Sequence, residues 1–252
     1  MRTNIASDTS VTPMYTPTDK TAAASTSNRH PLELPFWLNE IFYSIQGEGT
    51  RAGLPCVFVR LHGCKLRCSY CDTKYAIDRR SGGEHVTGAM IDRVVRSHQC
   101  SFVEFTGGEP LEQVNTFALM HYYCDEGFTV AVETGGHVDT AACDERVIKI
   151  VDMKTPSSKM VQMNNYNNLH PEVLRSHDEV KFVIGTREDY EWSKNLLFDY
   201  DLHKRTASVL FSPVFGAIEC KTLVEWILQD HLPVRFQLQM HKFVWHPDAR
   251  GV

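Results

Sequence analysis

Short apolar runs alternate with amphipathic stretches along the chain from about residue 35 onward. Six of these runs have the length and composition of β-strands, at residues 57–61, 102–105, 128–132, 147–153, 180–184 and 208–211. Three stretches have helical periodicity, at residues 111–125, 187–198 and 222–230. Strands that alternate with helices are typical of a parallel α/β sheet. A further alternating run predicts a strand at residues 235–244.

The order of these elements predicts the fold class. About six parallel strands within residues 31–252 indicate α/β architecture in a single domain, a partial βα barrel that is open on one side. The loops that follow the strands of such a barrel emerge on one face, where these folds carry their active sites. Residues 1–30 are rich in Ser, Thr and Ala with few large apolar side chains, so we expect a disordered tail there.

Composition narrows the class of protein. Of the 252 residues 42% are hydrophobic, which is enough for one sizeable core. The net charge of −5 does not favour binding to nucleic acid, which requires a positively charged surface, and no apolar run is long enough to cross a membrane. Five scattered cysteines are expected to be buried thiols in a reducing compartment, the cytoplasm: Cys56, Cys100, Cys124, Cys143 and Cys220.

The other three cysteines lie in one short run after the first predicted strand. Cys64, Cys68 and Cys71 are separated by three and then two residues. A closed zinc or iron–sulfur site takes four protein ligands, so three thiolates leave one metal position open. Two alternatives remain for this run: a zinc site completed by a histidine such as His62, or plain buried thiols.

This spacing resembles the signature of radical S-adenosylmethionine (SAM) enzymes. The resemblance implies a four-iron four-sulfur (4Fe-4S) cluster whose fourth iron is chelated by SAM, and a fold of the radical SAM type. The run Gly107-Gly108-Glu109-Pro110 follows the second predicted strand and resembles the turn that binds the SAM amine in that superfamily. Two glycines let bare backbone approach a ligand closely, although such turns often only reverse the chain.

The segment before the first predicted strand carries the candidate substrate residues. Gln46 and Glu48 are two residues apart, so both face the same way if the segment is extended, and together they can read a guanine-like edge. Arg60, at the end of the strand, suits a carboxylate. A surface hairpin with solvated polar side chains would have the same residue types.

These features together resemble the 7-carboxy-7-deazaguanine synthase family of radical SAM enzymes. The shared motifs are residues 42–49, 60–73, 106–110, 133–134, 212–214 and 239–245. The resemblance implies conversion of 6-carboxy-5,6,7,8-tetrahydropterin to 7-carboxy-7-deazaguanine with loss of ammonia, in the biosynthesis of queuosine and other 7-deazapurines. It also implies a magnesium ion, a flavodoxin or ferredoxin as reductant, and a homodimer.

The resemblance further implies roles for individual residues. The cluster ligands are Cys64, Cys68 and Cys71, and the magnesium ligand is Thr73. The residues that hold SAM are Tyr70, Cys71, Asp72, Gly108, Glu109, Thr134, Asp152, Met153 and Lys154. The residues that hold substrate are Ile45, Gln46, Gly47, Glu48, Arg60, Thr106 and Val252. No general base is assigned, because abstraction of a hydrogen atom needs none.

Three of these roles have specific alternatives. Thr73 could instead cap a helix. Many family members have Ser-Pro-Lys where this chain has Asp152-Met153-Lys154, so Asp152 is expected to replace the serine contact to SAM. The carboxylate of Val252 is expected near the substrate, although most chain ends lie frayed in solvent.

Two other functions share part of these features. A glycyl-radical activating enzyme would share the cysteine triplet and the partial barrel, but it would act on a protein and would not need Gln46, Glu48 and Thr73. A zinc-binding module would use the same thiolates without catalysis.

Overall fold

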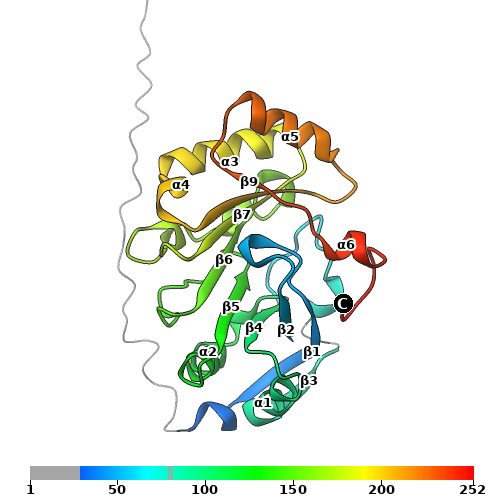
Figure 1. Ribbon diagram of the computed structural model, residues 1–252, viewed down its shortest axis with the longest axis vertical. Coiled ribbons are helices and arrows are strands. Elements are labelled where there is room, and N and C mark those ends of the chain that lie inside the picture. The colour runs from blue at the N-terminus through cyan, green and yellow to red at the C-terminus, as the bar shows by residue number, and fades with distance from the viewer. Residues whose placement is uncertain (1–28, 79, 81) are drawn as a thin grey trace, which may run out of the picture.

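The computed structural model describes residues 29–78, 80 and 82–252, and in this part of the chain the strands form one open sheet (Figure 1). The strand order is β3-β1-β2-β4-β5-β6-β7-β8-β9, and the sheet does not close on itself. The strands are β1 Pro35–Ile45, β2 Pro55–Leu61, β3 Glu84–Thr87, β4 Phe102–Gly107, β5 Thr129–Thr134, β6 Ile148–Met153, β7 Glu179–Ile184, β8 Ser208–Pro213 and β9 Arg235–Phe236.

All six strands predicted from the apolar runs are present, as β2 and β4 to β8. Neighbouring strands from β2 through β9 are parallel, whereas β1 pairs antiparallel with both β2 and β3. The expected partial, open barrel of parallel strands is therefore confirmed. The predicted tail lies almost entirely outside the described residues, and its disorder stays a prediction.

Helices cover the outer face of the sheet (Figure 1). On that face lie α1 Gly88–Ser97, α2 Asn115–Asp125, α3 Arg187–Asp199, α4 Leu202–Arg205 and α5 Cys220–Gln229, whereas the short helix α6 His241–Val244 packs against the loop that follows β1. The three predicted helices correspond to α2, α3 and α5. None of the helices in the described residues is long and apolar enough to span a membrane.

The core divides along the sheet because each strand alternates its two faces. Under α1 and α2, side chains such as Val59, Phe105 and Val132 are fully buried with Leu119 and Tyr123 of α2. A second cluster, under α3 to α5, packs β6 to β8 against side chains of these helices. The inner face of β2, β4, β5 and β6 has only a small apolar cluster. The rest of the inner face is free to carry polar chemistry.

The strand predicted at residues 235–244 is wrong over most of its length. Only Arg235–Phe236 pairs with β8, and the chain then turns into the short helix α6. Beyond Phe236, polar contacts with the loop after β1 take the place of strand hydrogen bonds. The side chains of Gln237 and Gln239 donate to Glu48, and the Met240 N–H donates to Gly47 O at 3.1 Å. The alternation of apolar and polar residues in this segment arises because one side of the segment contacts the loop that follows β1.

The ends of β2 and β4 approach so closely that two glycines are required. Gly107 has φ +147°, and an added Cβ would lie 2.1 Å from Leu61 O. At Gly108 it would lie 2.4 Å from Gly63 O. The N–H groups of Gly108 and Glu109 donate to Leu61 O at 3.0 Å and to Gly63 O at 2.9 Å. The glycine turn is therefore docked directly on the start of the cysteine run.

We expect Gly107→Ala to destabilise the fold strongly, because the new Cβ meets backbone that cannot move aside. The free energy of unfolding should fall by more than the ~1–3 kcal/mol that an unfavourable φ alone costs. Gly127→Ala is the matched control, since Gly127 also has positive φ (+81°) but, apart from its chain neighbours, no described residue has an atom within 4 Å of an added Cβ. Thermal unfolding of the two variants measures the difference, and equal losses would contradict this account of the junction.

Candidate active site

Polar side chains of the inner face converge near the carboxyl ends of the parallel strands. They occupy the strand positions that alternate with the helix-facing core. In strand order they are Arg60 on β2, Glu104 and Thr106 on β4, Glu133 on β5, Asp152 on β6 and Lys181 on β7. The loops that follow these strands carry the other predicted site residues, as the barrel topology requires.

The cysteine loop follows β2 and is anchored on three sides. The Gly63 N–H donates to Ala76 O at 2.7 Å, the Lys65 N–H to Glu112 Oε1 at 2.8 Å, and the Ser69 N–H to Ser158 O at 3.0 Å. These bonds fix the backbone on which the three cysteines stand.

The thiols themselves are shielded from water. Cys64 is buried, while Cys68 and Cys71 are half-buried. Burial raises the pKa of the Cys64 thiol to about 12 and also raises the pKa of the other two. The charge of Lys154 acts on all three in the opposite direction. Thiolates here need a cationic centre, which a bound metal cluster provides.

The arrangement disfavours the zinc alternative. Within the described residues no three His, Cys, Asp or Glu side chains converge tightly enough for a single metal ion. His62, the proposed fourth ligand, has both ring nitrogens engaged, by Asn39 Nδ2 at 2.9 Å and by Asp78 O at 2.8 Å. Three soft donors on separate positions of one loop fit an iron–sulfur cluster, in which each thiolate binds a different iron.

Glu109, in the glycine turn, is fully buried and holds two loops together. Its carboxylate accepts from Leu111 N at 3.1 Å, Thr134 Oγ1 at 2.9 Å and Gly135 N at 2.7 Å. Burial raises its pKa, whereas the neighbouring His137 and these donors lower it. Glu109 and Thr134 therefore support the turn from within, and their contact with SAM stays a prediction.

Residues at the end of β6 and directly after it form a polar group facing the cysteine loop. Lys154 Nζ donates to Asp152 Oδ2 at 2.9 Å, whereas Asp152 Oδ1 is buried and has no hydrogen-bond partner among the described residues. Tyr70 lies nearby, with its hydroxyl 3.4 Å from Thr155 Oγ1. An orphaned carboxylate oxygen fits the hydroxyls of a ribose. The Met153 side chain packs in the helix-facing core, so only its backbone is available to SAM.

Lys181 is the cationic centre of the inner face. Its ammonium group lies 3.0 Å from Glu48 Oε2 and 3.8 Å from Asp152 Oδ2, and it also donates to Glu133. Burial would lower its pKa, but these carboxylates raise it well above the usual value. The pKa of Glu133 is lowered, because Lys181 outweighs the effect of burial. This lysine therefore carries a fixed positive charge among three anions.

The predicted substrate loop lies over this charge cluster. The Gln46 side-chain amide donates to the buried Glu104, and its oxygen accepts from Glu48 N at 3.1 Å. The orientation of the amide is thus fixed. Gly47 packs against α6, since an added Cβ would lie 2.8 Å from His241 Nδ1. Gln46 and Glu48 contact different partners, Glu104 and Lys181, and their joint recognition of a guanine-like edge stays a prediction.

Arg60 lies in an aromatic and acidic setting beside that loop. Its Nε donates to Glu40 Oε1 at 2.8 Å, and its guanidinium lies 5.4 Å from the Phe42 ring and 5.9 Å from the Tyr75 ring. The Tyr75 hydroxyl donates to the same Glu40 oxygen at 3.0 Å. Among the described residues, Arg60 donates through Nε alone, so its terminal nitrogens keep their hydrogen-bonding capacity, and their contact with a substrate carboxylate stays a prediction.

The remaining predicted substrate residues surround the same region. Ile45 is the last residue of β1, and Thr106 is the strand partner of Arg60 in the register of β4 with β2. Val252 follows Gly251, which packs against β1. The structure therefore brings these residues together, and their contact with substrate stays a prediction.

Thr73 does not cap the turn that follows it. Its hydroxyl makes no capping hydrogen bond to the 3₁₀ turn Lys74–Ala76 and donates instead to Asp72 Oδ1 at 2.9 Å. Burial raises the pKa of Asp72, but Lys242 outweighs it and holds that pKa well below its usual range. The helix-cap alternative is thus not what the structure forms, and a hard oxygen remains beside the cluster loop.

Sequence reasoning missed several residues that hold the site. Glu104 and Lys181 fix the amide and the charge of the inner face, and the available signal was a polar residue between two buried apolar ones, Val103 and Phe105 in β4 and Val180 and Phe182 in β7. Glu40 holds Arg60 from the neighbouring strand. No local pattern marks such contacts, because the partners lie far apart along the chain.

The chain matches the model of the Radical SAM superfamily over residues 58–198, and it belongs to that superfamily. A 7-carboxy-7-deazaguanine synthase from Chlorobaculum tepidum is 44% identical over 228 residues, covering 87% of this chain and 99% of the relative. The synthase from Koribacter versatilis is 37% identical over 228 residues, covering 85% and 99%. The chain therefore belongs to the 7-carboxy-7-deazaguanine synthase family, as its motifs indicated.

The fold is also that of a solved structure, QueE from Escherichia coli. The TM-score is 0.69 at 22% sequence identity, and the match covers 84% of this chain and 97% of that chain. The resemblance confirms the radical SAM type of partial barrel.

We expect the stability of the Glu104→Gln variant relative to the parent to increase as pH rises. Burial, together with Glu133 and Glu48, raises the pKa of Glu104 above its ordinary 4.5. The stability that this group contributes is therefore present below pH 4.5 and lost as pH increases towards the raised pKa. The glutamine keeps an acceptor for Gln46 but does not titrate.

Urea unfolding of parent and variant across pH 5 to 8 measures this effect, with a limiting slope of about 1.4 kcal/mol per pH unit. Glu225→Gln, on the exposed side of α5, is the control for loss of one carboxylate. A stability difference between E104Q and parent that does not change with pH would contradict the prediction.

Proposed function

We propose that this protein converts 6-carboxy-5,6,7,8-tetrahydropterin to 7-carboxy-7-deazaguanine with loss of ammonia, as a radical SAM carbon–nitrogen lyase feeding queuosine and 7-deazapurine biosynthesis. The observation that carries the proposal is that the cysteine loop and the loop of Gln46 and Glu48 border one polar inner face. The 44% identity to a synthase over 99% of that relative supports the same reaction.

The cofactors supply the difficult step. When bound, a 4Fe-4S cluster and SAM would supply the radical chemistry that removes a hydrogen atom from the substrate. Cys64, Cys68 and Cys71 would hold the cluster. Asp152 would accept from the SAM ribose through Oδ1, which no described residue bonds, and Lys154 holds the orientation of that carboxylate through Oδ2.

The protein's own contribution is to orient the substrate and exclude water. Glu48 accepts from the pterin amino and ring nitrogens. The Glu48 carboxylate is held in place by Lys181, whose Nζ donates to Oε2 at 3.0 Å. The Gln46 amide is pre-oriented by Glu104 and presents its oxygen side to the loop. Arg60, steadied by Glu40, takes the substrate carboxylate through its terminal nitrogens. Each of these contacts is charge-assisted or fixed before the substrate arrives.

Several further assignments belong to this proposal. Thr73 offers an oxygen ligand for magnesium, with substrate and water completing the shell. A flavodoxin or ferredoxin delivers the electron, and the protein acts as a homodimer in the cytoplasm. The eight free thiols support a reducing compartment.

Turnover of the carboxy-tetrahydropterin by the anaerobically reconstituted protein tests the function. We expect 7-carboxy-7-deazaguanine from the parent and complete loss of SAM cleavage in Cys64→Ala, Cys68→Ala and Cys71→Ala, because one iron loses its anionic ligand. Cys220→Ala, on α5, should retain full activity. Cluster formation and SAM cleavage without pterin turnover would favour a glycyl-radical activating enzyme, and 5′-deoxyadenosine from any triplet variant would refute the cluster assignment.

Thr73→Ala tests the magnesium site. We expect lower product formation and a weaker response to added magnesium, with the cluster absorbance unchanged, because a hard oxygen is removed beside the cluster loop. The thermal midpoint should stay near that of the parent, since this hydroxyl caps no turn. An unchanged magnesium titration would remove Thr73 from the metal site.

A further inference from the structure

Residues 237–242, which we term the C-terminal strap, tie the substrate loop to the end of the sheet. The Gln237 side chain accepts from Gly49 N and donates to Glu48 Oε2, the latter at 2.9 Å. The Met240 N–H donates to Gly47 O at 3.1 Å. The strap thus contacts each residue from Gly47 to Gly49, and in Figure 1 α6 lies beside the segment that follows β1.

The same strap reaches the cluster loop. Lys242 Nζ donates to Asp72 Oδ2 at 2.9 Å, and Asp72 follows the cluster ligand Cys71 directly. Gln239 contacts both loops with one amide group. Its Nε2 lies 3.2 Å from Glu48 Oε1 and 3.3 Å from Asp72 Oδ2. An amide nitrogen carries two hydrogens, so it can donate one to each carboxylate at once.

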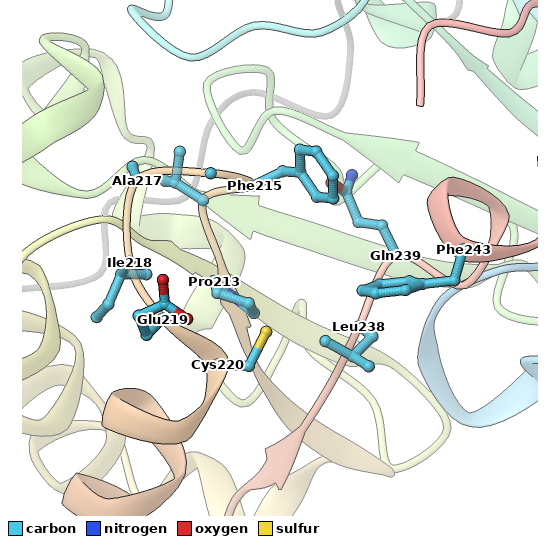
Figure 2. A pocket seen from close by; sticks show the side chains of 11 residues that line it. Pro213, Phe215, Ala217, Ile218, Glu219, Cys220, Leu238, Gln239 and Phe243 are labelled. Atoms are coloured by element: carbon cyan, nitrogen blue, oxygen red, sulfur yellow. The ribbon is translucent and has the colours of Figure 1, made fainter. Parts of the chain in front are cut away.

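Packing on the outer side keeps the strap in place. Lys242 Nζ lies 5.2 Å from the centre of the Phe215 ring, and Phe243 meets the same ring edge-on at 6.4 Å. Figure 2 shows the Gln239 side chain extending toward Phe215. Both residues line a pocket of about 240 Å³. The Gln239 backbone is therefore fixed, and its half-buried side chain has two defined partners.

We propose that Gln239 is a positioning residue that couples the SAM site to the substrate site, so that each ligand binds more tightly when the other is present. The inference rests on the proposed function, in which Asp72 holds SAM and Glu48 holds the pterin. Gln239 touches neither ligand and acts through the two carboxylates.

The coupling follows from sharing one amide between two anions. A ligand that fixes Asp72 also fixes the Gln239 amide, and the amide then fixes Glu48 before the second ligand arrives. The first ligand therefore meets the entropy cost of ordering the Gln239 amide, and the second ligand does not meet it again. Linkage requires the effect to be equal in both directions. SAM should therefore tighten pterin binding by the same factor as pterin tightens SAM binding.

Equilibrium binding to the reconstituted protein tests this coupling without turnover. The cluster is kept oxidised, reductant is omitted, and SAM is titrated by calorimetry with and without saturating carboxy-tetrahydropterin. We expect pterin to tighten SAM binding in the parent by about fivefold or more, and the reverse titration to give the same factor. In Gln239→Met, which keeps the length of the side chain but not its donors, the factor should fall to about one while both ligands still bind.

Two neighbours in the strap provide matched controls. Gln237 bonds Glu48 but not Asp72, so Gln237→Met should weaken pterin binding and keep the coupling factor. Lys242 bonds Asp72 but not Glu48, so Lys242→Met should weaken SAM binding and leave the coupling factor unchanged. If Q239M does not fold, Gln239→Asn, one methylene shorter, should lose the coupling in the same way.

The outcomes separate the inference from the function on which it rests. A parent factor near one, a Q239M factor equal to that of the parent, or a folded Q239M that binds neither ligand would each overturn the coupling role. A parent that binds SAM but no pterin would refute the proposed function, and the coupling with it. Loss of the factor in Q239M alone, with both controls coupled, supports the inference.

Discussion

The close backbone contact between the ends of β2 and β4 is the constraint on which the site depends. At Gly107 and Gly108 the chain leaves no room for a Cβ, and the turn can therefore bond directly to the start of the cysteine loop. Glu109 extends this unit to β5, where a Cβ at Gly135 would lie 2.9 Å from Leu66 of the cysteine loop. Three loops that are distant in sequence thus form one rigid support, as preorganised chemistry requires.

Charge balance is the second constraint, because the inner face buries ions. Lys181 and Lys154 stand among Glu48, Glu133 and Asp152, and an isolated charge at any of these positions would be costly. Such a cluster adds little stability compared with apolar packing. Its value lies in orientation, because the carboxylates face the loops that receive the ligands and cannot turn away.

The six parallel strands could be predicted because their outer faces carry apolar residues that helices bury. Strand β1 was missed because most of its side chains are only half-buried, and α6 because polar contacts with Glu48 and Gly47 set the conformation there. The cysteines and the glycine turn were legible as local motifs. Partners such as Glu40 and Lys181 were not, since each meets its site residue only through strand pairing or across the sheet.

Asp152, which stands where many family members have a serine, depends on the surrounding charges of the inner face. A serine at this position brings a hydroxyl and no charge, whereas an aspartate brings a buried anion that must be balanced. Lys154 lies 2.9 Å from Oδ2, and Lys181 lies 3.8 Å from the same atom. Both lysines lie on the Oδ2 side of the carboxylate, and Oδ1 has no hydrogen-bond partner in the part of the chain that the structure describes. A buried acceptor is costly when unpaired. This free acceptor supports the proposal that Asp152 receives a hydrogen bond from a hydroxyl of SAM.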